Sequence, residues 1–112
     1  MSDSASYSRV FKQAKRSRDD MFTVLYRSND FDQARLGLAI SKKNCKLATD
    51  RNRLKRLVRE SFRTHRETLA GLDVIVLNRP AATTTANSEL TGRLEKHWQR
   101  CRDNRTDGEA KN

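Results

Sequence analysis

The chain has 112 residues, with 24 Lys and Arg against 14 Asp and Glu and a formal net charge of +10. This length is typical of one domain, which we expect to span residues 1–112 with a flexible tail from about residue 102. No apolar run approaches the roughly 18–20 residues that cross a bilayer, and the first residues lack the features of a secretory signal. We therefore expect a cytoplasmic protein without a membrane partner and with reduced cysteines.

The first half of the chain predicts one helix and two strands. Apolar side chains recur at helical spacing over residues 4–16, where a serine can cap the helix. Residues 21–27 are rich in β-branched and aromatic side chains, which indicates a strand. Residues 35–41 alternate between large and small side chains, so we expect the large ones to face the core. Gly37 and Ala39 then leave the opposite face shallow.

The second half predicts a long helix, a strand and a last helix. The long helix runs from a cap at Thr49 or Asp50 to about Leu69. Residues 73–79 form a continuous apolar strand of the kind that lies centrally and is covered on both faces. Ser88 caps a last helix with one apolar stripe. The order α-β-β-α-β-α indicates a two-layer α+β sandwich.

The excess positive charge is concentrated in one short segment. Residues 42–63 hold 9 basic and 2 acidic side chains, a net charge of +7, against +2 for residues 1–41 and +1 for residues 64–112. Concentrated charge of one sign repels itself, so this segment indicates an anionic partner. Nucleic acid is the commonest such partner for a small basic protein.

The long helix separates its charges from its apolar side. At 100° per residue, with Leu54 at 0°, the apolar and small side chains fall within about 80° of it, and Asn52 falls on the opposite face. Arg51 and Arg53 flank this face at the first turn, and we interpret Glu60 as holding neighbouring guanidiniums in place. The basic residues of the opposite face are Lys55, Arg56, Arg59, Arg63 and Arg66.

Four short motifs follow one another through the second strand, the next loop and the long helix. They are residues 35–38 (RLGL), 40–44 (ISKKN), 51–57 (RNRLKRL) and 59–63 (RESFR). This ordered set closely resembles the protein component of bacterial ribonuclease P, whose signature is the Arg-Asn-Arg segment. Weaker similarity extends to the first helix, the last strand and the last helix.

The resemblance implies a fold and a function. The fold is a small α-β sandwich whose four-stranded sheet contains a left-handed β-α-β crossover, so we expect a fourth strand within residues 21–41 or near 27–31. The function is that of a subunit that assists a catalytic RNA in removing the 5′ leader from precursor tRNA. Magnesium is bound mainly by the RNA, with no metal bound tightly by the protein and no obligate protein partner.

The resemblance also assigns site residues. The residues assigned to RNA contact are Lys42, Lys43, Asn44, Arg51, Asn52, Arg53, Lys55, Arg56, Arg59 and Arg63. Tyr7 and Phe11 are assigned to a cleft that holds the single-stranded leader between the first helix and the sheet. Ordinary packing on the sheet is the alternative for these two side chains.

Two expectations for substitutions follow from the helix geometry. Charge reversal at Arg53 or Arg56 is expected to weaken RNA binding with little effect on stability, because both side chains oppose the core. Leu57→Ala is expected to cost about 2–4 kcal/mol of folding free energy with little direct effect on affinity.

No catalytic site is predicted in the chain. The carboxylates are scattered, whereas a metal-dependent nuclease needs them clustered. Asp19 and Asp20 are interpreted as a solvated turn, His65 as a core-edge residue and His97 as part of a helix surface. Composition leaves two other partners open, ribosomal RNA and duplex DNA read by the basic helix. A strand rather than a short helix precedes the basic helix, which argues against a helix-turn-helix DNA reader.

Overall fold

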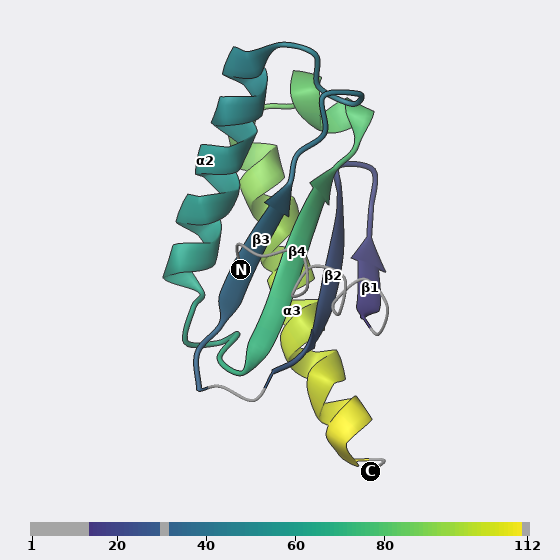
Figure 1. Ribbon diagram of the computed structural model, residues 1–112, viewed down its shortest axis with the longest axis vertical. Coiled ribbons are helices and arrows are strands. Elements are labelled where there is room, and N and C mark those ends of the chain that lie inside the picture. Colours follow the sequence, from purple (N-terminus) through teal and green to yellow (C-terminus); the bar gives the residue numbers. More distant parts are fainter. Residues whose placement is uncertain (1–13, 30–31, 111–112) are drawn as a thin grey trace.

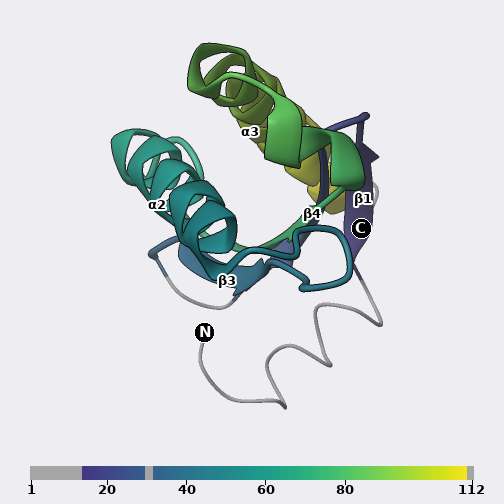
Figure 2. The same ribbon diagram turned by 90° about the horizontal axis from the view of Figure 1, so that it is seen from above.

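The computed structural model describes residues 14–29 and 32–110, and these form a two-layer α+β sandwich. Its elements in chain order are β1 (Lys15–Arg18), β2 (Phe22–Ser28), β3 (Arg35–Ala39), α2 (Ala48–Thr64), β4 (Leu72–Asn78), the 3-10 helix η1 (Pro80–Thr84) and α3 (Asn87–Ala110). Figure 1 and Figure 2 show both long helices on one face of the sheet. The fold class is therefore the expected one. Most of the predicted first helix lies outside the described residues.

The sheet has four strands in the order β1-β2-β4-β3. β1 pairs with β2 and β2 with β4 in antiparallel fashion, whereas β3 and β4 are parallel. α2 connects these two parallel strands across the helical face of the sheet (Figure 1). Seen from the helices, β4 lies to the left of β3, so the crossover is left-handed as the resemblance implied.

β4 is the buried centre of the sheet. Val74 and Val76 pack in the main core beneath the helices, and Ile75 is fully buried on the other face together with Leu25. The continuous apolar run therefore predicted this strand correctly. Two neighbouring strands and burial on both faces remove water from it, which is the environment that such a run needs.

The fourth strand was predicted in the wrong place. It is β1, which pairs antiparallel with β2 and lies at the edge of the sheet. Residues 15 and 16, predicted as the end of the first helix, belong to this strand. Its sequence, Lys-Arg-Ser-Arg, shows no apolar alternation because three of its four side chains are exposed. Charged edge strands of this kind protect a sheet from pairing with other chains.

The apolar stripes of the two helices pack where the pattern placed them. Leu54 and Val58 of α2 are fully buried in the core cluster, as are the stripe residues of α3. Trp98 joins the two helices: its Nε1 donates to Ser61 Oγ at 2.9 Å, and its ring meets Phe62 edge-on at 6.0 Å. This contact sets how α2 lies against α3.

The predicted ends of the helices need correction. α2 begins after Leu47 without a side-chain cap, so neither Thr49 nor Asp50 is the cap, and it ends at Thr64 rather than near Leu69. The chain reverses towards β4 through turns that end at Gly71, whose φ of 86° favours glycine. α3 starts one residue before Ser88 and is helical to Ala110. Flexibility of the tail stays a prediction.

Candidate nucleic-acid interface

The charged side of α2 points away from the sheet. We call Asn52, Lys55, Arg56, Arg59 and Arg63 the basic face of α2. All of these side chains are exposed except Lys55, which is half-buried. Glu60 accepts a hydrogen bond from Arg63 at 2.8 Å, and both side chains are more than 60% exposed (62% and 65%). The interpretation of Glu60 as a residue that orients a neighbouring guanidinium is therefore confirmed for Arg63.

Arg51 binds the loop that precedes α2. Its Nη1 donates to the carbonyl of Cys45 at 3.0 Å and to that of Lys46 at 2.8 Å. The guanidinium thus holds the loop against the first turn of the helix. Lys42 and Lys43 are exposed in the same loop. The structure therefore joins the two predicted basic groups, the loop and the helix.

Arg53 binds η1 and the start of α3. Its Nη2 donates to the carbonyls of Thr83 at 2.9 Å and Ala82 at 3.4 Å. Its Nη1 donates to the carbonyl of Thr85 at 3.5 Å and to Asn87 Oδ1. The expectation that Arg53 matters little for stability assumed a side chain that stands away from the fold. The structure instead shows this side chain tying α2 to the segment that leads into α3, so we revise that expectation.

The loop that carries Lys42 and Lys43 is also bound by the end of β4. Asn78 is buried, and its Oδ1 accepts the backbone N–H of Ser41 at 2.7 Å. Asn44 Nδ2 donates to the Asn78 carbonyl at 2.9 Å, and Thr83 Oγ1 donates to the Asn44 carbonyl at 3.1 Å. Asn44, predicted to contact RNA, thus has its side-chain amide bound to the end of β4. No pattern in the sequence indicated the role of Asn78.

The sheet face opposite the helices carries small and apolar side chains. Leu25 and Ile75 form a small cluster there with neighbouring small and apolar side chains, and Gly37 pairs with Ile75 in the register. Arg16 pairs with Leu25 across the strands, so Arg16 and Arg18 belong to this face, and both are exposed. We call this surface the outer face of the sheet. Tyr7 and Phe11, predicted to line a cleft here, lie outside the described residues.

One end of the outer face carries a partly buried ion pair. Arg35 grips Asp73 through two bonds of 2.7 Å, and Asn29 Nδ2 donates to the same carboxylate at 2.9 Å. Burial alone favours the protonated acid, but the bonds from Arg35 and Asn29 outweigh it and lower the pKa of Asp73. This charged pair ties the start of β3 to the start of β4.

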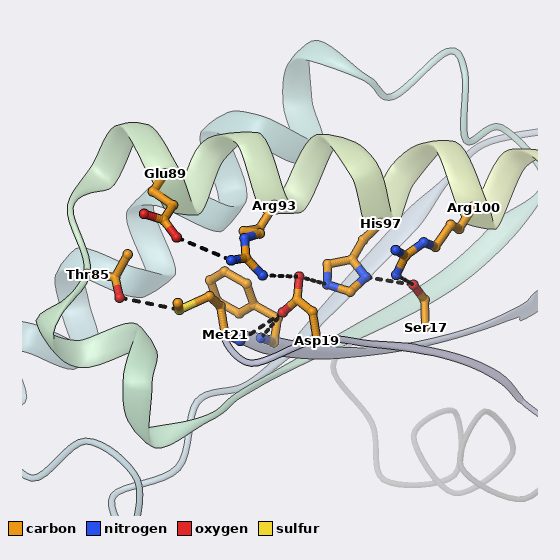
Figure 3. A network of polar contacts seen from close by, with 9 residues as sticks. Ser17, Asp19, Met21, Thr85, Glu89, Arg93, His97 and Arg100 are labelled. Atoms are coloured by element: carbon orange, nitrogen blue, oxygen red, sulfur yellow. Dashed lines mark hydrogen bonds and ion pairs between the residues drawn. The ribbon is translucent and has the colours of Figure 1, made fainter.

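A polar network joins β1 to α3 (Figure 3). Ser17 Oγ lies 2.7 Å from His97 Nδ1, and Asp19 Oδ2 lies 3.0 Å from His97 Nε2. Among the described residues Nε2 has no well-aligned acceptor, so we treat the second contact as electrostatic. Asp19 also accepts the backbone N–H groups of Met21 and Phe22. Asp19 and His97 are thus structural, and the predictions of a solvated turn and a helix surface were wrong for them.

Burial controls how this network ionises. Desolvation lowers the pKa of His97, and the nearby charges of Arg100 and Arg93 act in the same direction, so together they outweigh the raising effect of Asp19. Burial opposes ionisation of Asp19, yet its two backbone hydrogen bonds and His97 lower the pKa of its carboxyl. Ser17 and His97 are both buried. A substrate has no access to this Ser-His-Asp arrangement, so we assign it no catalysis.

The described residues hold neither a metal cluster nor a membrane span. Over residues 14–29 and 32–110, no three His, Cys, Asp or Glu side chains are grouped so that they could bind a metal ion. No helix in this part of the chain is both long and apolar enough to cross a bilayer.

The fold and the basic face define the class of this protein: a small α+β domain whose left-handed crossover is an arginine-rich helix. The family model described as Ribonuclease P matches residues 1–102. The chain belongs to this family, as the resemblance of its motifs indicated.

Individual relatives agree with this assignment. The chain is 53% identical over 94 residues to the ribonuclease P protein component of Thioalkalivibrio sulfidiphilus, covering 84% of this chain and 78% of the relative. It is 44% identical over 96 residues to that of Nitrosococcus oceani, covering 86% and 81%. The solved structure of the Staphylococcus aureus RNase P protein superposes with a TM-score of 0.80 at 30% identity, covering 86% of this chain and 88% of that one. The Thermotoga maritima protein gives 0.76 at 31%, covering 84% and 89%.

Family membership fixes the general function. The protein is a subunit of ribonuclease P and assists its RNA in the 5′ processing of tRNA. The RNA of that enzyme is therefore its partner.

Proposed function

We propose that the protein docks on the catalytic RNA of ribonuclease P through the basic face of α2 and the lysines of the preceding loop. The direct contacts are Lys42, Lys43, Asn52, Lys55, Arg56, Arg59 and Arg63. The observation that carries this proposal is the exposure of most of these side chains on one side of a helix, with a single acid, Glu60, among them. Guanidinium groups gathered on one surface suit an RNA backbone, because each can donate two parallel hydrogen bonds to a phosphate.

Arg51, Arg53 and Asn44 have a different role in this proposal. Their side-chain donors bind carbonyls within the chain. They hold the loop and η1 in place, so that the exposed lysines and arginines are pre-arranged before RNA arrives. Pre-arrangement reduces the entropy lost on binding.

We propose that the 5′ leader of precursor tRNA lies on the outer face of the sheet. Gly37 and Ala39 place only small side chains on this face. Arg16 and Arg18 stand exposed along the same face, where they can neutralise leader phosphates. Tyr7 and Phe11 remain proposed contacts of the leader.

Magnesium is, in this proposal, held mainly by the RNA subunit. The protein contributes positive charge that screens the repulsion between RNA strands, so that substrate and metal bind at a lower magnesium concentration. We place this complex in the cytoplasm, in keeping with two buried cysteines, Cys45 and Cys101, that form no disulfide.

The test of docking is cleavage of precursor tRNA by the catalytic RNA at low magnesium, with and without the protein. The protein should restore cleavage, and a protein with Arg56→Glu and Arg59→Glu should not. If both proteins restore cleavage equally, the basic face of α2 is not the docking surface.

The leader assignment has its own test. The double variant Arg16→Gln and Arg18→Gln should raise KM for a precursor with a long leader and leave KM unchanged for one with a leader of a single nucleotide. An equal effect on both substrates would place the leader elsewhere.

A further inference from the structure

A groove opens between α2 and α3, next to the basic face. Its volume is about 680 Å³, within the range of roughly 300–1,000 Å³ that is typical of sites for small organic ligands. Asn52, Arg56 and Glu60 line it from α2, and Thr91 lines it from α3. Figure 2 shows the two helices side by side above the same face of the sheet. The groove thus lies beside the surface that we propose for RNA docking.

The lining combines apolar contact with hydrogen-bonding groups of both kinds. Leu57 is half-buried and supplies apolar area. Asn52 and Thr91 can donate and accept, Arg56 only donates, and an ionised Glu60 only accepts. A phosphate needs donors alone, so a carboxylate in the lining disfavours it. A flat base with an apolar surface and a polar edge matches this combination of groups.

Glu60 is the informative residue. A carboxylate on a surface that approaches a polyanion costs electrostatic free energy unless it receives hydrogen bonds from the partner. Among the described residues its Oε2 accepts from Arg63, and its Oε1 accepts no bond. The carboxylate of this groove-lining residue therefore has acceptor capacity left.

We propose that this groove binds an unpaired nucleobase of the partner RNA and that Glu60 accepts hydrogen bonds from the edge of that base. Guanine fits best, because its N1–H and N2–H groups are adjacent donors on one edge. Single-stranded RNA is commonly read in this way, through bases that leave the stack. This inference rests on the proposed docking of α2 on RNA.

The test uses the direction in which one substitution changes the affinity for RNA. Electrostatics alone predicts that Glu60→Gln, which removes a negative charge, binds the ribonuclease P RNA more tightly or equally. Our proposal predicts the opposite, a loss of at least about fivefold in affinity, because a base donor loses its carboxylate acceptor. Glu95→Gln is the matched control, since Glu95 is exposed on α3 outside the groove. It should bind as well as the unchanged protein or slightly better.

A second variant separates this inference from the proposed function. Arg59 belongs to the basic face and does not line the groove, so Arg59→Gln reports on phosphate contacts. If Arg59→Gln loses affinity and Glu60→Gln does not, the docking surface stands and the groove inference is wrong. If neither variant loses affinity, both proposals are wrong. Thermal melting followed by circular dichroism checks that each variant stays folded. We expect little change in stability for Glu60→Gln, because the Glu60–Arg63 pair that it weakens is exposed on the surface of α2.

Nucleotide titration gives an independent reading. Guanosine 5′-monophosphate should shift the amide resonances of Asn52, Thr64 and Thr91 in the intact protein, and uridine 5′-monophosphate should shift them less. Glu60→Gln should abolish the difference between the two nucleotides. Equal shifts with both nucleotides in the unchanged protein, or shifts confined to other surfaces, would overturn the proposal.

Discussion

At the scale of single residues, the arginines of α2 divide into two groups that the sequence pattern does not separate. The guanidinium of Arg53 donates to carbonyls of η1, whereas Arg56 is exposed. Both stand in the same motif with the same chemistry. The difference arises because η1, which is distant in sequence, folds next to one of them.

This division predicts different effects of two alanine substitutions. Arg53→Ala should lower the free energy of unfolding by about 1–3 kcal/mol, because carbonyls that accept from a charged donor lose it. Arg56→Ala should change it by less than about 0.5 kcal/mol and should weaken RNA binding instead. Urea unfolding followed by circular dichroism measures both. Equal midpoints for the two variants would contradict the structural role of Arg53.

Two leucines of α2 provide a second comparison. Leu54 is fully buried in the core, whereas Leu57 is half-buried and lines the groove. Leu54→Ala should therefore cost about 2–5 kcal/mol. Because Leu57 is only half-buried, Leu57→Ala should cost less than the value of about 2–4 kcal/mol expected from helix geometry. A thermal or urea melt of both variants ranks them. If Leu57→Ala lowers the free energy of unfolding more than Leu54→Ala does, the apolar stripe of α2 is not centred on Leu54.

At the scale of elements, β1 depends on α3. This short charged strand pairs with β2 alone, and it is further held by Ser17, which contacts His97, and by Lys15, which donates to the Asn104 carbonyl at 2.6 Å. Because these contacts span most of the chain, their effect is invisible in any local pattern. They explain why a histidine on α3 is buried.

The buried histidine makes stability depend on pH. The folded-state pKa of His97 lies below the unfolded value of 6.5, so the unfolded chain takes up the proton first. The free energy of unfolding should thus be highest above pH 6.5 and fall as pH drops from 6.5 through the folded-state pKa of His97. Asp19 and Asp73, with lowered pKa values, extend the loss below pH 3.8.

Urea unfolding at pH 7.5, 6.5 and 5.5 tests this expectation. His97→Gln should flatten the dependence between pH 6.5 and 5.5. A protein that gains stability on acidification over this range would refute the assigned protonation of His97.

At the scale of the whole molecule, the sequence predicted what local periodicity controls. The apolar stripes, the central strand and the separation of charge along α2 follow from spacing alone, and the motif set identified the family. The missed features depend on partners far along the chain. β1 carries almost no apolar signal, Asn78 anchors a loop 34 to 37 residues away, and the roles of Arg51 and Arg53 depend on carbonyls whose positions only the folded chain defines.

The central claim is that the exposed charges of α2 neutralise RNA phosphates. Its most direct measurement is the affinity for the ribonuclease P RNA as a function of salt. A protein with Arg56→Gln and Arg59→Gln should bind more weakly, and the slope of log affinity against log salt should become less steep by about 2. Lys96→Gln with Arg102→Gln removes the same charge from exposed positions of α3 and should leave the slope nearly unchanged. Equal slopes for the two double variants would contradict the account.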